Sequence, residues 1–322
     1  MKKILCLLLI FSLFLCLVLT AFSGCGLRDN GKLKIVVTIY PIYDWVMQVL
    51  GDREDDVEVT LLLNSGADMH SYSSSAADMV AIAKADLFIY VGGESDDWVR
   101  DSMKNPVNKN RHAMNLLSLL GDRAHYEELV QGMESTEERE EEEEGEYDEH
   151  VWLSLRNAAY YVELIAEELS IIDEEYSEFY RENAKAYIAE LNALDARYIE
   201  MAEASPRDTL IFGDRFPFRY MVEDYGWKYY AAFSGCAAEV EASFATRRFL
   251  IDKANELSVN VILELENSSS KLADKICEDS VAKEVKVLDS LQSATKKDYQ
   301  KGRNYLSVMT SNLETLRAAL AQ

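Results

Sequence analysis

The chain is organised around the segment Asn64-Ser65-Gly66-Ala67-Asp68-Met69-His70. It follows an apolar run, residues 57–63, that predicts a strand, and it precedes residues 75–85, which predict a helix. Open α/β sheets place ligand-contacting residues at the carboxyl ends of their strands. A lone histidine at a strand end is more often a surface residue, but a second histidine, His150, lies about 80 residues further on, and the chain has only 4 His. Two imidazoles that a fold brings together are typical of a metal site on a two-lobed protein.

Strands and helices alternate on both sides of one long helical segment. That segment runs from about Asp173 to Ala204, some 30 residues or roughly 45 Å. Alternating strands and helices predict parallel sheets covered by helices. The predicted class is therefore α/β, with two parallel-sheet αβ lobes joined by a long spine helix. The strands are expected at residues 33–40, 57–63, 87–91, 113–116, 209–212, 228–233, 261–266 and 286–289.

The N-terminus has the pattern of an export signal. Lys2 and Lys3 precede an almost wholly apolar run, residues 4–21, which is too short for an ordinary membrane span. Residues 22–25, Phe-Ser-Gly-Cys, resemble a bacterial lipobox and predict a lipid on Cys25; a plain secretion signal with an incidental cysteine is the alternative. A lipid there would hold the protein outside the cytoplasm at the cell membrane without spanning it.

The predicted organisation has five parts. These are a signal peptide (1–24), a lipidated tether (25–32), an N-terminal αβ lobe (33–156), connecting helices that include the spine (157–204) and a C-terminal αβ lobe (205–322).

Charge restricts the partners. The formal net charge of -24 argues against nucleic acid as a partner, because phosphate binding needs basic patches. The same charge favours a cation as the partner.

The most acidic segment is residues 134–149, which hold eleven acidic residues against one basic residue, Arg139. Such a run repels itself and predicts a solvated loop.

Several segments together resemble one protein family. They are VVTIYPIYDWV (36–46), the run from residue 62 to residue 93 that contains His70, EHVWLSLRNA (149–158), YMVEDYGW (220–227) and YLSVMTSNLETLRAAL (305–320). This set resembles the helix-spined, metal-binding solute-binding proteins of bacterial ABC importers for zinc and manganese. The resemblance covers essentially residues 33–320, with an unusual insert at the acidic run. It implies a C-clamp that binds one divalent metal between its lobes.

The resemblance also implies ligands. His70 and His150 match the first two, and Asp289 matches the carboxylate ligand after the last strand. The position of the third ligand, usually His or Glu, falls on Arg215, which cannot ligate a metal because it stays protonated. Arg215 is therefore expected to pair with one of the carboxylates and keep it ionised.

Other carboxylates are candidates for the missing ligand of the second lobe. They are Asp214, Glu239 and Glu241. Asp214 could equally be a hydrogen-bonding loop residue, and the two glutamates could instead be surface residues or partners of Arg215. Asp68 is expected to be a turn residue or a partner of His70. Cys236 offers a thiol near the cleft; it could instead pair with Cys277, or both could be buried thiols.

We predict a lipid-anchored, extracytoplasmic, monomeric receptor that binds Zn²⁺ and delivers it to an ABC permease. A manganese receptor of the same family is the first alternative, because Arg215 stands at the position of the family's third ligand, which is usually His or Glu. An adhesin-like surface lipoprotein and a sugar or amino-acid receptor are further alternatives. The protein is not expected to be an enzyme, since no HExxH or comparable motif of a metallohydrolase is present.

Overall fold

The structure is a computed structural model, and it describes residues 31–66, 68–104, 106–134, 145–236, 241–268 and 271–321. The predicted signal peptide and Cys25 lie outside these residues, as do Glu239 and the middle of the acidic run. Within the described part of the chain, no helix has both the length and the apolar character that crossing a membrane requires. Leu33 to Gln322 forms one compact unit.

Two four-stranded parallel sheets form the framework, which confirms the predicted fold class. The first has the order β2-β1-β3-β4 and the second the order β6-β5-β7-β8. The strands of the first sheet are β1 (Leu33–Val37), β2 (Val57–Leu61), β3 (Leu87–Tyr90) and β4 (His112–Asn115). Those of the second are β5 (Thr209–Phe216), β6 (Lys228–Ser234), β7 (Val261–Leu265) and β8 (Glu284–Leu288). The predicted boundaries between the parts of the chain stay predictions.

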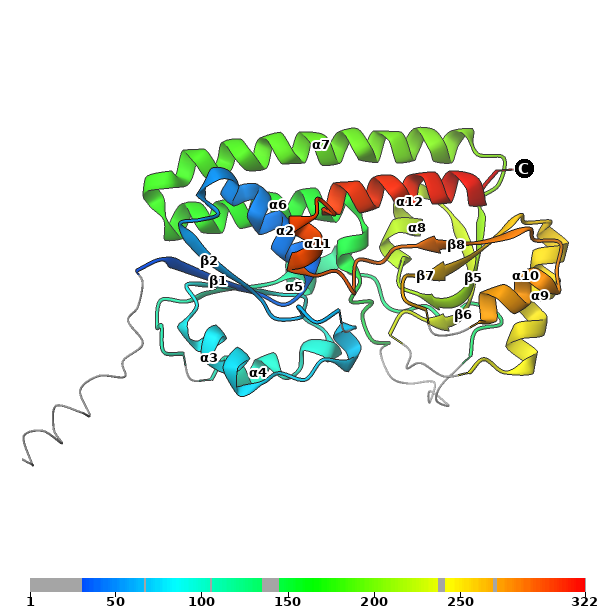
Figure 1. Cartoon of the computed structure of the whole chain (residues 1–322), viewed down its shortest axis with the longest axis horizontal. Coiled ribbons are helices and arrows are strands. Elements are labelled where there is room, and N and C mark those ends of the chain that lie inside the picture. Colours follow the sequence, from blue (N-terminus) through cyan, green and yellow to red (C-terminus); the bar gives the residue numbers. More distant parts are fainter. Residues whose placement is uncertain are drawn as a thin grey trace, which may run out of the picture. The chain divides into compact units, whose positions relative to one another are not determined.

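One long helix, α7 (Ser177–Ala204), passes over both sheets (Figure 1). Beneath it lie α2 (Tyr40–Leu50), α6 (Leu155–Ile172) and α12 (Tyr305–Ala319), and α7 packs against all three. Pro41, which follows the predicted first strand, lies in the first turn of α2, where its missing N–H is not needed. The remaining helices are α3 (Ala76–Lys84), α4 (Val99–Ser102), α5 (Leu116–Leu120), α8 (Arg219–Tyr225), α9 (Phe244–Leu257), α10 (Leu272–Glu278) and α11 (Lys296–Gln300).

Both faces of the inner strands β1 and β3 are buried, which explains why these strands are largely apolar. In β1, Ile35 and Val37 face the large core under the helices around α7, whereas Val36 faces a smaller cluster under α3 and α4. In the second lobe, α9 and α10 cover the opposite face of the sheet in the same way. The large core is continuous from one lobe to the other, so the lobes share one hydrophobic interior.

The acidic run differs from its prediction at its C-terminal end. Asp148 and Glu149 are buried, with exposures of 3% and 2%, because backbone N–H groups and a histidine hydrogen-bond their carboxylates. Tyr126 and Tyr147 form an antiparallel bridge with stacked rings, which closes the base of the run. The prediction of a solvated loop for all of 134–149 is therefore wrong at its C-terminal end.

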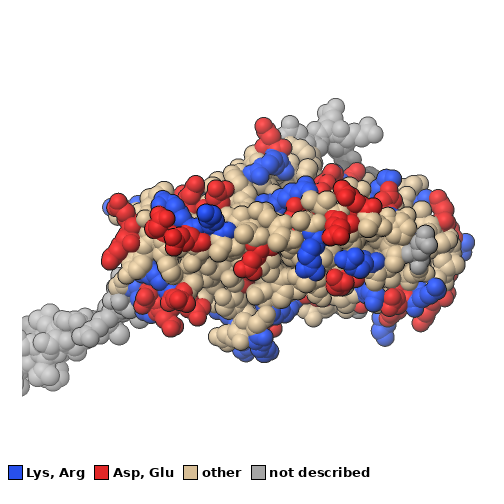
Figure 2. Space-filling model, turned by 90° about the horizontal axis from the view of Figure 1, so that it is seen from above, with Lys and Arg blue, Asp and Glu red and all other residues tan. Residues whose placement is uncertain are grey.

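Charged side chains of both signs are interspersed on the face that carries α7 (Figure 2). The large negative net charge therefore does not make that face uniformly acidic.

Candidate metal centre

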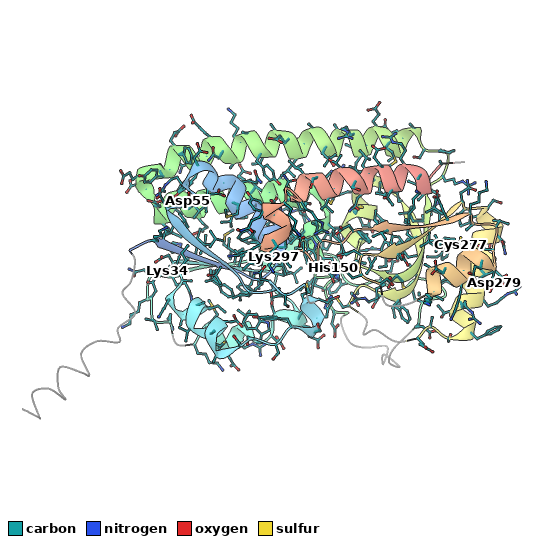
Figure 3. All side chains as sticks on the ribbon, viewed as in Figure 1. Lys34, Asp55, His150, Cys277, Asp279 and Lys297 are labelled. Carbon is teal, nitrogen blue, oxygen red and sulfur yellow. The ribbon has the colours of Figure 1, made fainter. Side chains whose placement is uncertain are left out.

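Two short loops bring His70 and His150 together between the lobes. His70 lies in a 3-10 turn, Met69–Ser71, two residues after Asp68, whose carboxylate accepts a hydrogen bond from His70 N (3.0 Å). His150 directly precedes another such turn, Val151–Leu153, and Asp148 accepts from His150 N in the same way (2.8 Å). The two Nε2 atoms are 3.3 Å apart. The predicted meeting of these two imidazoles is therefore present in the fold, and Figure 3 shows His150 between the two sheets.

Each imidazole is oriented through its other nitrogen. His70 Nδ1 lies 2.7 Å from Ser95 Oγ, and His150 Nδ1 lies 3.0 Å from Asp148 Oδ1. An oxygen beside each Nδ1 can hold the ring proton there, which is how proteins commonly prepare Nε2 of a histidine as a ligand. Nε2 of His150 also donates to the amide oxygen of Gln292, so it has to lose this proton when it binds a metal. Two nitrogens bound tetrahedrally to zinc at ~2.0–2.1 Å lie about 3.3 Å from each other. The pair thus has the spacing of one edge of a zinc tetrahedron.

The two imidazoles cannot both carry a positive charge at this separation. Burial, followed by the neighbouring charge of His150, lowers the pKa of His70 to about 3. His70 is therefore a neutral imidazole at neutral pH, the form that binds a metal.

Glu149 supports the position of Ser95. Its Oε1 accepts a hydrogen bond from Ser95 N (2.8 Å), and its Oε2 lies 3.7 Å from His70 Nδ1. Gly93 packs against this carboxylate with a positive φ of 83°, and an added Cβ would come within 2.3 Å of Glu149 Oε1. A glycine at position 93 is therefore required, both by the positive φ of the backbone and by the close contact with Glu149.

The carboxyl group of Glu149 is also buried. This burial raises the pKa of Glu149 to about 7.

The third donor near the histidines is the thiol of Cys236. The ligand atoms of His70, His150 and Cys236 all lie within 4.8 Å of one another. The approach of this loop depends on Gly235, since an added Cβ would lie 2.8 Å from His150 Cε1 and 3.0 Å from Phe216 O. Burial raises the pKa of the Cys236 thiol, so a nearby cation is needed for it to ionise.

Within the residues that the structure describes, Cys236 forms no disulfide. Cys236 and Cys277 are both free thiols, and Figure 3 places Cys277 in α10, far from His150. The alternative of a Cys236–Cys277 bond is therefore not realised.

Arg215 and Gln292 line the side of the centre that faces the second lobe. Arg215 Nη2 pairs with Asp68 Oδ2 at 2.6 Å. The amide of Gln292, oriented to satisfy both neighbours, donates to Asp68 Oδ2 (2.7 Å) and accepts from His150 Nε2 (2.8 Å). Among the described residues the partner of Arg215 is Asp68, and not Asp214, Glu241 or Asp289; a pairing with Glu239 lies outside the described residues. Asp68 caps the His70 turn as expected and also links the two lobes.

The predicted carboxylate ligands have other partners. Asp289 accepts from Leu291 N (2.8 Å) and pairs with Arg303. Asp214 accepts from Arg215 N (2.8 Å) and from Leu265 N (3.1 Å). Among the described residues, the cluster of possible metal donors includes neither of them, nor Glu241. Metal ligation by these three, and by Glu239 outside the described residues, stays a prediction.

Sequence reasoning missed the roles of Gln292, Ser95 and Glu149. A signal for Gln292 exists, because it lies in the loop directly after β8, at the edge of a sheet where ligands bind. Trp152 Nε1 donates to Ser290 O (2.8 Å) and ties that loop to the segment of His150.

Two parallel-sheet lobes, a helix that spans both and a nitrogen and sulfur donor cluster between them define a metal-binding solute-binding protein. The model of the zinc-uptake complex component A family, described as periplasmic, matches residues 35–319. The chain belongs to this family.

Curated relatives and a solved structure agree. Zinc-binding lipoprotein AdcA of Streptococcus pneumoniae is 33% identical over 299 residues, which are 92% of this chain and 57% of that protein. The chain thus spans little more than half of AdcA. The high-affinity zinc uptake system protein ZnuA of Bacillus subtilis is 32% identical over 308 residues, covering 92% of this chain and 91% of that protein.

The Zn(II)-bound ZnuA-like domain of S. pneumoniae AdcA is a structural neighbour, with a TM-score of 0.71 and 31% identity over 91% of this chain and 100% of that domain. These matches confirm the predicted family resemblance.

Proposed function

We propose that this protein is an extracytoplasmic zinc receptor of an ABC importer. It binds one Zn²⁺ through Nε2 of His70 and of His150 and through Sγ of Cys236, and it passes the ion to a membrane permease. A lipid on Cys25 retains the monomeric protein at the membrane.

The observation that carries the proposal is the pair of Nε2 atoms at 3.3 Å, each with its Nδ1 held by an oxygen. Nitrogen and sulfur donors suit zinc, whereas manganese prefers oxygen-rich sites. The thiol of Cys236 therefore favours zinc over the manganese alternative. Support for delivery to a permease comes from the family, and from the zinc-binding and zinc-uptake names of the relatives.

The test is a competition titration with a chromophoric chelator on metal-free protein. His70→Ala and His150→Ala should each weaken zinc binding by at least ~10-fold, because each removes one bond to the metal. His112→Ala is the matched control, since the His112 imidazole pairs with Glu168 (2.8 Å) outside the donor cluster. Unchanged zinc affinity in both site variants would exclude the proposed site.

A further inference from the structure

The loop that carries Cys236 is held by a carboxylate from a distant part of the chain. Glu127 Oε1 accepts a hydrogen bond from Cys236 N at 2.9 Å, although the two residues are 109 positions apart. β6 ends at Ser234, so only Gly235 separates Cys236 from the strand. Because a glycine restrains the backbone less than any other residue does, β6 alone does not fix the position of Cys236. The contact with Glu127 provides a second attachment for this residue.

The same carboxylate lies close to the sulfur atom. Burial, followed by the negative charge of Glu127, raises the pKa of the Cys236 thiol. Glu127 and Gly235 also line the same small cavity, together with Asp148. Glu127 is therefore placed to hold the thiol of Cys236 as well as its backbone.

The backbone of Glu127 is itself fixed. Residues 125–127 pair with residues 146–148 in a short antiparallel ladder, through backbone hydrogen bonds of 2.8 Å and one β-bridge. Tyr220 of α8 contacts both segments, because its hydroxyl accepts from His125 N (3.2 Å) and donates to Asp148 O (3.0 Å). The side chain of Glu127 therefore extends from a backbone that is held on both sides.

This ladder carries an outer partner for two of the three metal donors. Asp148, on one segment, accepts from His150 Nδ1 at 3.0 Å, and Glu127, on the other, accepts from Cys236 N. Among the described residues, Glu127 itself is not a member of the donor cluster, which consists of His70, His150 and Cys236. The position of the thiol relative to the imidazole of His150 therefore depends on this one ladder.

We propose that Glu127 is a positioning residue of the zinc site, which holds Cys236 so that Sγ completes the donor set with His70 and His150. Glu127 acts through Cys236 and does not bind the metal itself, as Asp148 acts through His150. Outer partners of metal ligands typically contribute about 10–100-fold to metal affinity. This inference rests on the proposed zinc-binding function.

The test is a double-variant cycle, measured by the competition titration for zinc and by the absorption spectrum of the cobalt-substituted protein. Glu127→Ala should weaken zinc binding by ~10-fold and reduce the sulfur-to-cobalt charge-transfer absorption, because Cys236 loses its attachment. Glu127→Gln should retain most of both, since the amide oxygen can still accept from Cys236 N. Thermal unfolding of the metal-free variants confirms that each is folded.

The cycle separates a positioning role from a general loss of stability. In Cys236→Ala protein, adding Glu127→Ala should weaken zinc binding by a further ~2-fold at most, because the residue through which Glu127 acts is absent. A further loss of ~10-fold in that background would overturn the proposal. So would equal losses in Glu127→Ala and Glu127→Gln, which would assign the effect to charge alone.

Glu146→Ala is the matched control. It removes an exposed carboxylate from the paired segment and keeps the backbone oxygen that accepts from Glu127 N (2.8 Å), so the zinc affinity should stay at the wild-type value. A folded Glu127→Ala protein that matches this control in zinc affinity and in cobalt spectrum would contradict the inference. A failure of the proposed function is distinguishable, because Cys236→Ala alone would then leave the zinc affinity unchanged, or the wild type would bind no zinc.

Discussion

Asp148 is the residue whose replacement probes the centre without removing a metal ligand. Its Oδ1 accepts hydrogen bonds from both His150 N (2.8 Å) and His150 Nδ1 (3.0 Å), and the side chain is buried. It therefore fixes the ring orientation and holds a proton on Nδ1, so that Nε2 is the nitrogen available to the metal. Asp148→Asn keeps an acceptor oxygen but loses the charge, whereas Asp148→Ala removes both hydrogen bonds.

The expected losses follow from these contacts. Outer partners of metal-bound histidines are worth about 10–100-fold in metal affinity. Asn should lie near the lower limit, ~10-fold or about 1.4 kcal/mol, because the hydrogen bond to Nδ1 can still form. Ala should lie near the upper limit, ~100-fold or about 2.7 kcal/mol, since it leaves the imidazole without its partner.

The assay is the same competition titration for zinc, together with thermal unfolding of the metal-free protein to confirm folding. Asp44→Asn is the matched control, because Asp44 is equally buried but its carboxylate contacts Tyr187 and Tyr305 rather than the histidines. A zinc affinity that stays at the wild-type value in folded Asp148→Ala would refute the orienting role. So would equal losses in the Asp148→Asn and Asp44→Asn variants.

Three further outcomes are expected. Cys236→Ser should weaken zinc binding by ~10-fold and abolish the sulfur-to-metal charge-transfer absorption of the cobalt-substituted protein; an unaltered spectrum would remove the thiol from the site. Burial raises the pKa of Asp44 from 3.8 to about 6. The folded state therefore binds a proton on the Asp44 carboxylate more tightly than the unfolded state does. As a result, the free energy of unfolding falls as pH rises from about 4 to about 6. Asp44→Asn should therefore raise the unfolding free energy at pH 7 by up to about 3 kcal/mol and flatten its pH dependence in that window, as measured by urea denaturation; an unchanged slope would contradict the assignment. Deleting residues 135–144 should leave the zinc affinity and the melting temperature close to wild type. The deletion retains Glu134 and residues 145–149, whose hydrogen bonds and β-bridge hold the two ends of the run to the protein. Loss of tight zinc binding would show that the deleted segment supplies a ligand.

The fold could be predicted from the sequence because local pattern and buried environment agree. Apolar runs such as residues 33–37 are buried on both faces, and the long polar-faced segment that became α7 has no competing interpretation. The base of the acidic run could not be predicted, since composition alone cannot show that Asp148 and Glu149 have hydrogen-bond donors from distant segments.

The site was predictable only in part for the same reason. His70 and His150 could be identified from their places beside strand and helix ends. The side of the site that faces the second lobe could not be identified, because it depends on long-range partners. Arg215 pairs with Asp68, 147 residues away, and Asp289 pairs with Arg303. Cys236 could be noted as a thiol near the cleft, but its distance from the histidines depends on the close approach that Gly235 permits.

The most direct test of the zinc centre is an anomalous difference map, measured at the zinc absorption edge, from crystals of the zinc-loaded protein. We predict one strong peak at ~2.0–2.1 Å from Nε2 of both His70 and His150 and at ~2.3 Å from Sγ of Cys236. A zinc peak that contacts neither imidazole, or one that is held by Asp289 and Asp214 without Cys236, would contradict this account.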